Sequence, residues 1–303
     1  MLPALVIHGG AGDVDEKRAL AKLKGVQIAA REGWKLLNQS GGSALDAVEA
    51  AVRVMEDDEN FNAGTGSVLN LDGDVEMDAL IMEGHKLNAG AVAAMRDVKN
   101  AVSVARLVME KSEHILIVGQ GANRFAEAHG VPRLEPGALI TDYEINCLED
   151  VKNKRKGNAP GVGTVGAVAV DKEGRVAVAL STGGTCGKTP GRVGDTPLLG
   201  CGGYCDEAVG AVASTGHGES ITKACLASTI FNLMKQGVPV QDAAEQSCEF
   251  LTARTGGTAG AIAVSKDGHL AVAHTTDKMS WATVSNGELR AGVKWGEEVV
   301  EKI

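Results

Sequence analysis

Two stretches of this 303-residue chain repeat one another: residues 163–182 read GTVGAVAVDKEGRVAVALST, and residues 257–276 read GTAGAIAVSKDGHLAVAHTT. Twelve of the twenty positions are identical. Each copy places short apolar runs on both sides of a Lys-acidic-Gly turn, which predicts two strands joined by that turn. Because both faces of these strands are small or apolar, we expect each sheet that contains them to be covered on both sides.

Segments with helical spacing occupy much of the remaining chain. Apolar residues recur every three or four positions, with charged residues between them, in residues 15–38, 43–55, 101–110, 121–128, 219–236 and 240–253. Short apolar runs predict further strands at residues 4–8, 67–71, 75–78 and 115–118, with turns at Asp72-Gly73 and Asn286-Gly287. Sheets packed on each other, with helices outside, fit this order better than a half-exposed sheet.

Periodicity disappears between residues 142 and 163. This stretch contains the basic run KNKRK, residues 152–156, followed by Gly157, Pro160 and Gly161. Glycine, proline and clustered charge are typical of a connecting segment. We therefore expect a solvated linker here, with a nuclear-targeting signal as the alternative.

The composition bounds the class of protein. The length suits one large domain or two ordinary ones. Glycine is over-represented, with 40 residues, and its clusters indicate turns and close backbone approaches to something small. A net charge of −9 argues against nucleic acid as a partner. No apolar run reaches the length of a membrane-spanning helix, so we expect no membrane partner.

The cysteines indicate a reduced protein. There are six, and none form a C-x-x-C pair; they are Cys147, Cys186, Cys201, Cys205, Cys225 and Cys248. The first residues, MLPALVIHGG, are too short and polar for a secretion signal, so we expect a cytoplasmic location. Metal binding by Cys201 and Cys205 is the alternative to structural thiols, but no partner pair has zinc-site spacing.

Thr164 is the first candidate for chemistry. It stands between glycines at the start of a predicted strand, directly after the predicted linker. A strand threonine is the plain interpretation. If the chain were cut between Gly163 and Thr164, however, the threonine would gain a free α-amine with a pKa of about 7.7–8.0. That amine could act as the base for its own hydroxyl, without a histidine.

Four other polar clusters lie beside glycines. They are Asn62-Ala63-Gly64, Ser181-Thr182-Gly183-Gly184, Gly191-Arg192-Val193-Gly194-Asp195 and Ser214-Thr215-Gly216-His217-Gly218-Glu219. Arg192 and Asp195 suit the carboxylate and ammonium of a free amino-acid end, and an ordinary ion pair is the alternative. The last cluster joins a strand to a helix, where backbone N–H groups can stabilise an oxyanion or simply cap the helix.

The order of these motifs resembles a known family. IHGGAG, EDD-x-x-FNAG-x-GSV, GTVGAVA, STGG, GRVGD-[ST]-P and TGHGE follow one another as in the plant-type asparaginases, also called isoaspartyl peptidases, which are N-terminal nucleophile hydrolases. The resemblance covers essentially the whole chain. It implies an α+β fold with a four-layer αββα sandwich, formed by a single domain over residues 1–303. It also implies self-cleavage at Gly163–Thr164, into an α chain 1–163 and a β chain 164–303.

Carried over position by position, the resemblance implies a catalytic role for five residues. Thr164 attacks the side-chain carbonyl of asparagine or of a β-aspartyl dipeptide, and L-aspartate leaves after an acyl-enzyme is hydrolysed. Thr182 supports the hydroxyl of the nucleophile. Thr215 and Gly216 supply the oxyanion hole, and Asn62 contacts the amine of the nucleophile.

The resemblance also implies how the substrate and an ion are held. Arg192 and Asp195 hold the α-carboxylate and α-ammonium of the substrate, helped by the carbonyl of Gly218. No cofactor is needed for catalysis, but the family carries a structural sodium loop of main-chain carbonyls. That loop falls on Met55, Glu56, Asp58, Phe61, Ala63 and Thr65. The segment GGTCGK departs from the family pattern at Gly187, where asparagine is common, and this bears on the flexibility of the substrate loop.

Three alternative functions remain to be considered. A glycosylasparaginase-type amidase would need secretion, and a taspase-like threonine endopeptidase would carry an aspartate in place of Gly163. A glycine-rich binding scaffold would have to explain why several polar clusters match one catalytic plan. The expected partners are a small amino-acid or dipeptide substrate and a second copy of the processed unit in a homodimer.

Overall fold

The computed structural model describes residues 3–153 and 163–303. Its larger sheet contains β1 (Ala4–Ala11), β2 (Met77–Glu83), β3 (Ala89–Met95), β4 (Leu116–Val118), β5 (Val165–Val170), β6 (Val176–Thr182), β11 (Met279–Ser285), β12 (Glu288–Gly292) and β13 (Val299–Lys302). Over the described residues, the strand order is β13-β12-β11-β1-β5-β6-β2-β3-β4, and only β3 and β4 pair in parallel. The smaller sheet has the order β10-β9-β8-β7, formed by β7 (Gly203–Asp206), β8 (Gly210–Gly216), β9 (Ala259–Ser265) and β10 (Leu270–His274).

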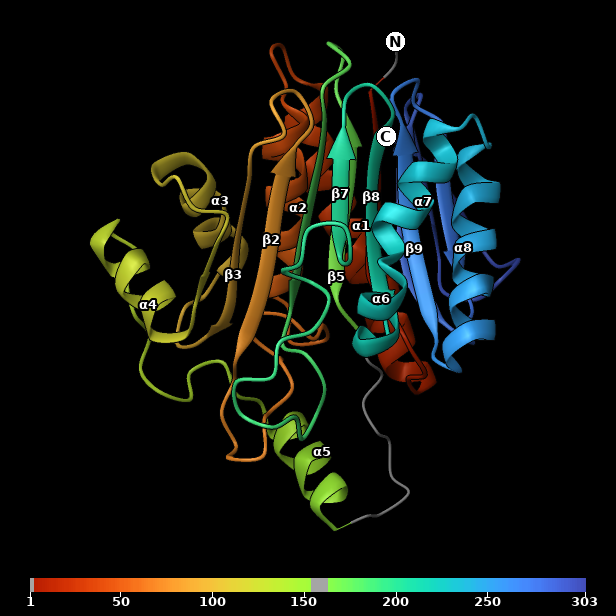
Figure 1. Cartoon of the computed structure of the whole chain (residues 1–303). Coiled ribbons are helices and arrows are strands. Elements are labelled where there is room, and N and C mark those ends of the chain that lie inside the picture. Colours follow the sequence, from red (N-terminus) through yellow and green to blue (C-terminus); the bar gives the residue numbers. More distant parts are fainter. Residues whose placement is uncertain (1–2, 154–162) are drawn as a thin grey trace.

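Helices cover the outer face of each sheet. On the larger sheet lie α1 (Glu16–Asn38), α2 (Ala44–Glu56), α3 (Ala101–Lys111) and α4 (Gly119–Ala128). On the smaller sheet lie α6 (Gly218–Ala224), α7 (Leu226–Lys235) and α8 (Val240–Thr255). The inner faces of the two sheets pack against each other (Figure 1). The predicted four-layer αββα sandwich is therefore confirmed.

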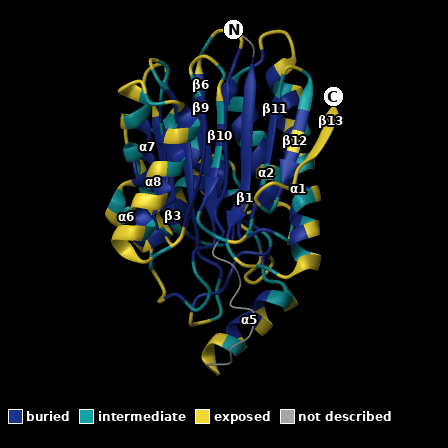
Figure 2. Cartoon of the chain, turned by 90° about the vertical axis from the view of Figure 1, so that its right-hand side faces the viewer, coloured by how far each residue is buried: buried dark blue, intermediate teal, exposed yellow. Residues whose placement is uncertain are grey.

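The alternation of side chains along each inner strand explains these layers. In β5, Ala167 and Ala169 face the core beneath α1 and α2, whereas Val168 and Val170 face the core between the two sheets. A third core lies between the smaller sheet and α6–α8. Strands with two buried faces fill the middle of the molecule, and exposed residues gather on the helices (Figure 2). The predicted double coverage of the repeat strands is confirmed.

The two copies of the repeat lie in different sheets. Residues 163–182 supply β5 and β6 of the larger sheet, and residues 257–276 supply β9 and β10 of the smaller one. The copies pack against each other across the central core, since β5 contacts β9. The same strand-turn-strand pattern thus supplies strands to both sheets.

Small residues let the outer layers approach closely. A Cβ placed on Gly33 of α1 would lie 2.9 Å from the side chain of Leu5 and 3.0 Å from the carbonyl of Ala47 in α2. Such spacing needs glycine and alanine at the contact, because interiors pack near crystal density and leave no room for larger groups. This packing explains how a chain with few aromatic residues forms a buried core.

The prediction of a linker over residues 142–163 was wrong for its first half. Residues Asp142–Lys152 form α5, which lies below the layers in Figure 1. Thr141 caps the helix by accepting from the backbone N–H of Glu144. The buried face consists of Glu144, Cys147 and Leu148. Because one of these residues is a glutamate, the sequence lacks the regular spacing of apolar residues by which a helix is predicted. Residues 154–162, with most of the predicted basic run and its targeting alternative, lie outside the described residues.

Three strand and helix boundaries also differ from the predictions. Residues 67–71 and 75–78 form no hairpin strands around Gly73; a single bridge joins Leu69 to Val75, and β2 begins at Met77. Asn70 explains this, since its side-chain oxygen accepts from two backbone N–H groups of the turn. The predicted helix 219–236 is divided at Cys225, whose φ of 44° is left-handed. The turn at Asn286-Gly287 is confirmed, with positive φ at both residues.

Candidate functional site

Thr164 lies buried at the start of β5, where the two sheets face each other. Its hydroxyl oxygen is 3.1 Å from the hydroxyl oxygen of Thr196, and its carbonyl accepts from the hydroxyl of Thr215 at 3.3 Å. Thr215 belongs to β8 of the smaller sheet, and its hydroxyl also accepts from the backbone N–H of Ala11 at 3.2 Å. Three threonines far apart in sequence therefore meet at this point.

Gly216, the other residue predicted for the oxyanion hole, follows Thr215 at the end of β8. Its φ of +131° and its contacts both demand glycine, because a Cβ there would lie 2.6 Å from the carbonyl of Thr258. Thr258 is the counterpart of Thr164 in the second repeat, and its carbonyl accepts from the N–H of His217 at 2.9 Å. The second copy of the repeat thus supports the loop that faces the first.

Thr182 and Asn62, the other two side chains predicted for catalysis, make their hydrogen bonds away from Thr164. Continuing the β5–β6 register from Val165 and Ser181 places Thr182 opposite Thr164. The hydroxyl of Thr182 accepts from the N–H of Gly184 at 3.0 Å, and Asn62 donates to the carbonyl of Gly184 at 2.7 Å. Within residues 3–153 and 163–303, no hydrogen bond joins either side chain to Thr164. Here the two residues shape the turn after β6.

Arg192, Asp195 and Gly218 come together as expected. A Cβ placed on Gly218 would lie 2.7 Å from the guanidinium of Arg192 and 3.0 Å from a carboxylate oxygen of Asp195. Asp195 is only 4% exposed, and burial raises the pKa of its carboxyl to about 7. Its second oxygen has no hydrogen-bond partner among the described residues. A buried polar atom left open in this way is suited to receive a donor from a ligand.

Arg192 already holds an anion in this structure. Its guanidinium forms an ion pair with Glu219 at 2.9 Å, with a second contact from its Nε at 3.0 Å. The side chain of Glu219 is half exposed, whereas that of Arg192 is 17% exposed. A substrate carboxylate would therefore replace a solvated partner, which costs little because exposed ion pairs contribute about 0–1 kcal/mol.

Two acidic residues, one in β2 and one just before it, hold the loop that carries Arg192. Asp78 of β2 is buried, and burial raises the pKa of its carboxyl. One of its oxygens accepts from the N–H of Ala94 at 2.9 Å and the other from the N–H of Gly194 at 3.2 Å. Glu76 accepts from the N–H of Gly191 at 3.0 Å. These bonds fix the backbone on both sides of the arginine.

Sequence reasoning gave no role at this site to Thr196, Asp78 or Glu76, nor to Glu219, although Glu219 belongs to a polar cluster named above. For Thr196 a signal existed: a hydroxyl residue follows Asp195 directly within the GRVGD-[ST]-P motif, and a fully buried hydroxyl needs a partner. For Asp78 and Glu76 the only signal was two carboxylates flanking Met77 at the start of an apolar run. Their contacts join segments more than a hundred residues apart, which no local pattern reveals.

Comparison with known proteins identifies the family. A family model described as asparaginase matches residues 1–293. The chain is 47% identical to an isoaspartyl peptidase/L-asparaginase of Xenopus laevis, over 99% of this chain and 98% of that one. It is 45% identical to one of Danio rerio (100% and 99% covered) and 46% identical to one of Bos taurus (98% and 98% covered). The chain belongs to the asparaginase family. As a member it is a hydrolase of the N-terminal nucleophile class.

Asparaginase-family enzymes need no catalytic cofactor, but the expected sodium loop can be compared with the geometry after α2. The backbone N–H of Thr65 donates to the carbonyl of Glu56 at 2.8 Å, and that of Phe61 to the carbonyl of Asp58 at 3.0 Å. Gly64 has a φ of +54°, and a Cβ there would lie 2.2 Å from the carbonyl oxygen of Glu56, so this position needs glycine. Each carbonyl keeps a second lone pair. A sodium ion on these carbonyls stays a prediction.

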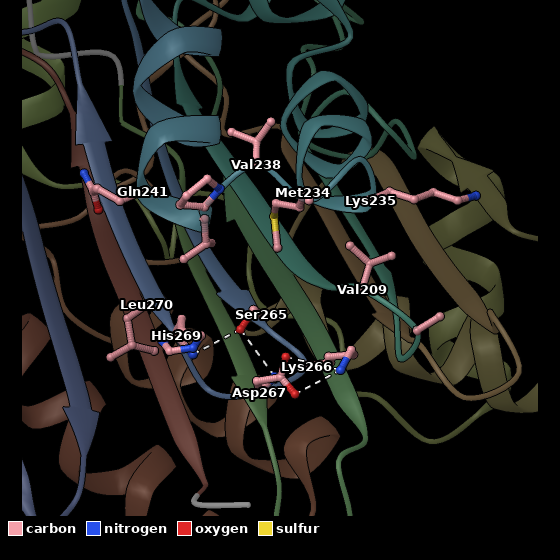
Figure 3. A pocket seen from close by; sticks show the side chains of 14 residues that line it. Val209, Met234, Lys235, Val238, Gln241, Ser265, Lys266, Asp267, His269 and Leu270 are labelled. Atoms are coloured by element: carbon pink, nitrogen blue, oxygen red, sulfur yellow. Dashed lines mark hydrogen bonds and ion pairs between the residues drawn. The ribbon is translucent and has the colours of Figure 1, made fainter.

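One cavity of the described residues is lined by none of the residues around Thr164. It has a volume of about 680 Å³ and is lined by the α7–α8 turn and by the turn between β9 and β10 (Figure 3). Met234 and Val209 form part of its apolar lining, and Lys266 and Asp267 lie at its polar side. No residue predicted for catalysis or substrate binding lines it.

Among the described residues, no helix is long and apolar enough to cross a membrane.

Gly187 carries the predicted departure from the family pattern. Its φ is +69°, and a Cβ there would lie 2.8 Å from the side chain of Val151 in α5. Its N–H donates to the carbonyl of Leu69 at 2.8 Å. Glycine thus lets the loop after β6 pack against α5.

The Gly10→Ala variant is expected to destabilise the fold and to slow any cleavage before Thr164. Gly10 has a φ of +102°, and a Cβ there would lie 2.5 Å from the Cα of Gly163. The methyl group must push Gly163 aside, in addition to about 1–2 kcal/mol of left-handed strain. Thermal unfolding and gel analysis of processing measure the two effects.

Gly41→Ala is the matched control. Gly41 also has a left-handed φ, of +71°, but nothing lies within 4 Å of its Cβ position. It should lose only the strain energy and process normally. Equal unfolding temperatures and equal processing in the two variants would show that the contact with Gly163 is unimportant.

Proposed function

We propose that this chain cleaves itself between Gly163 and Thr164 and then releases L-aspartate from L-asparagine and from β-aspartyl dipeptides. One observation supports this proposal above all: buried Thr164 contacts Thr196 and Thr215. Thr196 directly follows Asp195, which belongs to the cluster of Arg192, Asp195 and Gly218. The names of the relatives from Xenopus laevis, Danio rerio and Bos taurus support the same substrates. The glycosylasparaginase and taspase alternatives have no better support.

Self-cleavage would begin with the hydroxyl of Thr164. Its oxygen attacks the carbonyl carbon of Gly163, the C–N bond breaks, and an ester joins the two parts until water hydrolyses it. The new α-amine of Thr164 has a reference pKa of about 7.7–8.0, so it is partly unprotonated near neutral pH. The products are the proposed α chain 1–163 and β chain 164–303, which remain interleaved as one domain because β5 and β6 lie between β1 and β2.

Hydrolysis would then use the same hydroxyl. The α-amine removes the proton as the oxygen attacks the side-chain carbonyl of the substrate. Thr215 and the N–H of Gly216 stabilise the oxyanion, and ammonia or an amino acid leaves with a proton. Water releases aspartate from the acyl-enzyme. Thr196 positions the hydroxyl of Thr164, and Thr182 and Asn62 would turn toward the amine once cleavage has freed it.

The substrate would be held by its aspartyl end. Arg192 exchanges Glu219 for the α-carboxylate, and Asp195 accepts from the α-ammonium with its open oxygen, beside the carbonyl of Gly218. The same cluster serves both substrate types, since they differ only in the leaving group.

We also propose three further properties. The processed protein forms a homodimer, which light scattering tests, and it is located in the cytoplasm, which cell fractionation tests. A sodium ion binds the carbonyls of residues 55–65, and a thermal shift measured with sodium and with lithium tests this site.

A direct experiment tests the proposal. Purified protein is incubated and run on a denaturing gel, and aspartate release is measured with L-asparagine and with a β-aspartyl dipeptide. We expect two fragments of unequal length and aspartate from both substrates after processing. A chain that stays whole and inert would contradict the proposal, and comparing kcat/KM for the two substrates ranks them.

The pH dependence of kcat/KM is expected to report on Asp195. Burial raises the pKa of its carboxyl to about 7, so the free enzyme loses this negative charge as the pH falls through about 7. An uncharged carboxyl attracts the substrate ammonium less, and kcat/KM should fall on the acid side. Once bound, the ammonium keeps Asp195 ionised, so this limb should be absent from kcat, which reports on the complex. An acid limb of equal position in both profiles would assign it to the Thr164 amine alone.

A further inference from the structure

Two cysteines lie together behind the substrate cluster. Cys201 is in the turn before β7, and Cys225 is the residue between α6 and α7. Both sulfurs contact the carbonyl oxygen of Thr222, at 3.9 Å from Cys201 and 3.6 Å from Cys225. The two sulfurs therefore lie beside the same carbonyl oxygen. All six cysteines are free in this structure.

The backbone around the pair keeps the two residues next to each other. The carbonyl of Cys201 accepts from the N–H of Ala227 at 3.3 Å, and that of Gly200 from the N–H of Ser228 at 2.9 Å. Both donors belong to the first turn of α7, directly after Cys225. The turn that carries Cys201 is therefore bonded to the same helix end that carries Cys225.

The two thiols differ in access. Cys225 is exposed, whereas Cys201 is only 9% exposed. Cys225 also has a left-handed backbone, with φ 44° and ψ 53°, which a residue with a side chain rarely adopts. Burial, followed by the neighbouring Cys225, raises the pKa of the Cys201 thiol to about 12. An oxidant arriving from solvent meets Cys225 first.

We infer that Cys201 and Cys225 form a reversible disulfide that responds to peroxides and lowers the activity of the neighbouring site. In the first step, the sulfur of Cys225 displaces water from hydrogen peroxide and becomes a sulfenic acid. In the second step, the sulfur of Cys201 attacks the sulfur of Cys225, the S–O bond breaks, and hydroxide leaves with the thiol proton as water. Two thiols and one peroxide thus yield one disulfide and two waters, and a dithiol reductant reverses the change.

The effect on activity follows from the turn that Cys201 belongs to. The N–H of Cys201 donates to the carbonyl of Leu198, whose own N–H donates to the carbonyl of Asp195, both at 3.0 Å. Gly202 packs so tightly here that a Cβ would lie 2.6 Å from the carbonyl of Thr196. A disulfide needs its sulfurs about 2.05 Å apart. Drawing Cys201 toward α7 therefore displaces Asp195 and Thr196.

The experiment treats the full, reduced protein with hydrogen peroxide. We expect a loss of two hydrogens in the intact mass of the fragment that contains both residues, a peptide cross-link between Cys201 and Cys225, and recovery with dithiothreitol. Cys225→Ser and Cys201→Ser should each prevent the cross-link, and Cys186→Ser should not. Oxygen adducts without a cross-link, a cross-link between other cysteines, or one that survives either serine variant would overturn the inference.

A second experiment measures the activity of the oxidised protein, and it rests on the proposed hydrolase function. The oxidised protein should show kcat/KM lowered about tenfold or more, because small displacements of binding groups are costly. Dithiothreitol should restore it, and Cys225→Ser should remain active in peroxide. Unchanged kcat/KM with the disulfide formed would overturn the regulatory part. A reduced protein without activity would instead contradict the proposed function, while the mass measurement still decides the disulfide.

Discussion

The Thr164→Ala variant is expected to remain a single chain and to release no aspartate. The variant lacks the only oxygen that could attack Gly163 in the proposed step, and it lacks the nucleophile for substrate. Removing a catalytic nucleophile costs a factor on the order of 10⁶ in kcat. The fold should persist, because Thr164 stands at the edge of β5 and the methyl group of alanine fits the space it vacates. A denaturing gel and an aspartate assay on the same sample measure both losses.

Thr258→Ala is the matched control for this variant. Thr258 has the same place in the second repeat, between glycine and a strand, but it is exposed and no linker precedes it. Its known contribution at the site is its backbone carbonyl, which alanine retains. Thr258→Ala should therefore process and hydrolyse normally. If Thr164→Ala still divides into two fragments, or if Thr258→Ala is the inactive one, the assignment of the nucleophile is wrong.

The repeat explains why the layers could be predicted from the sequence. Residues such as Val168 and Ala169 are apolar on both faces of a strand, and only a sheet buried on both sides offers that environment. The same reasoning failed for α5, where Glu144 occupies the inward face. That glutamate is buried because Arg18 of α1 pairs with it at 3.2 Å. A partner 126 residues away is invisible to a local pattern.

The sequence motifs pointed to several residues that the structure brings together at the candidate site, but not to the contacts between them. Arg192 and Asp195 are three residues apart, and their chemistry is readable from the motif. The ion pair of Arg192 with Glu219 and the contact of Thr164 with Thr196 depend on how the loop after β6 crosses to the smaller sheet. That path is set by Asp78, which binds two backbone N–H groups from different segments. The spacing of residues along the chain does not predict contacts of this kind between distant segments.

The Arg192→Ala variant is expected to raise KM about 10- to 150-fold while changing kcat less. A charge-assisted, two-pronged hydrogen bond to the α-carboxylate contributes about 1.5–3 kcal/mol, and every 1.4 kcal/mol is tenfold in affinity. The loss falls on binding, because the reacting carbonyl lies at the other end of the aspartyl group. Steady-state kinetics on fully processed protein separate KM from kcat. The effect should be of similar size with L-asparagine and with a β-aspartyl dipeptide, since both present the same α-carboxylate.

Glu219→Gln distinguishes loss of substrate contact from loss of the existing ion pair. It removes the partner of Arg192 while leaving the guanidinium in place, and that partner is half exposed. An exposed pair contributes about 0–1 kcal/mol, so KM should stay the same or fall by no more than about fivefold. If Glu219→Gln instead raises KM as much as Arg192→Ala does, the arginine acts by holding α6 rather than by binding the carboxylate. If Arg192→Ala leaves KM unchanged, Arg192 does not bind the substrate, and the open oxygen of Asp195 would be the remaining anchor for the aspartyl end.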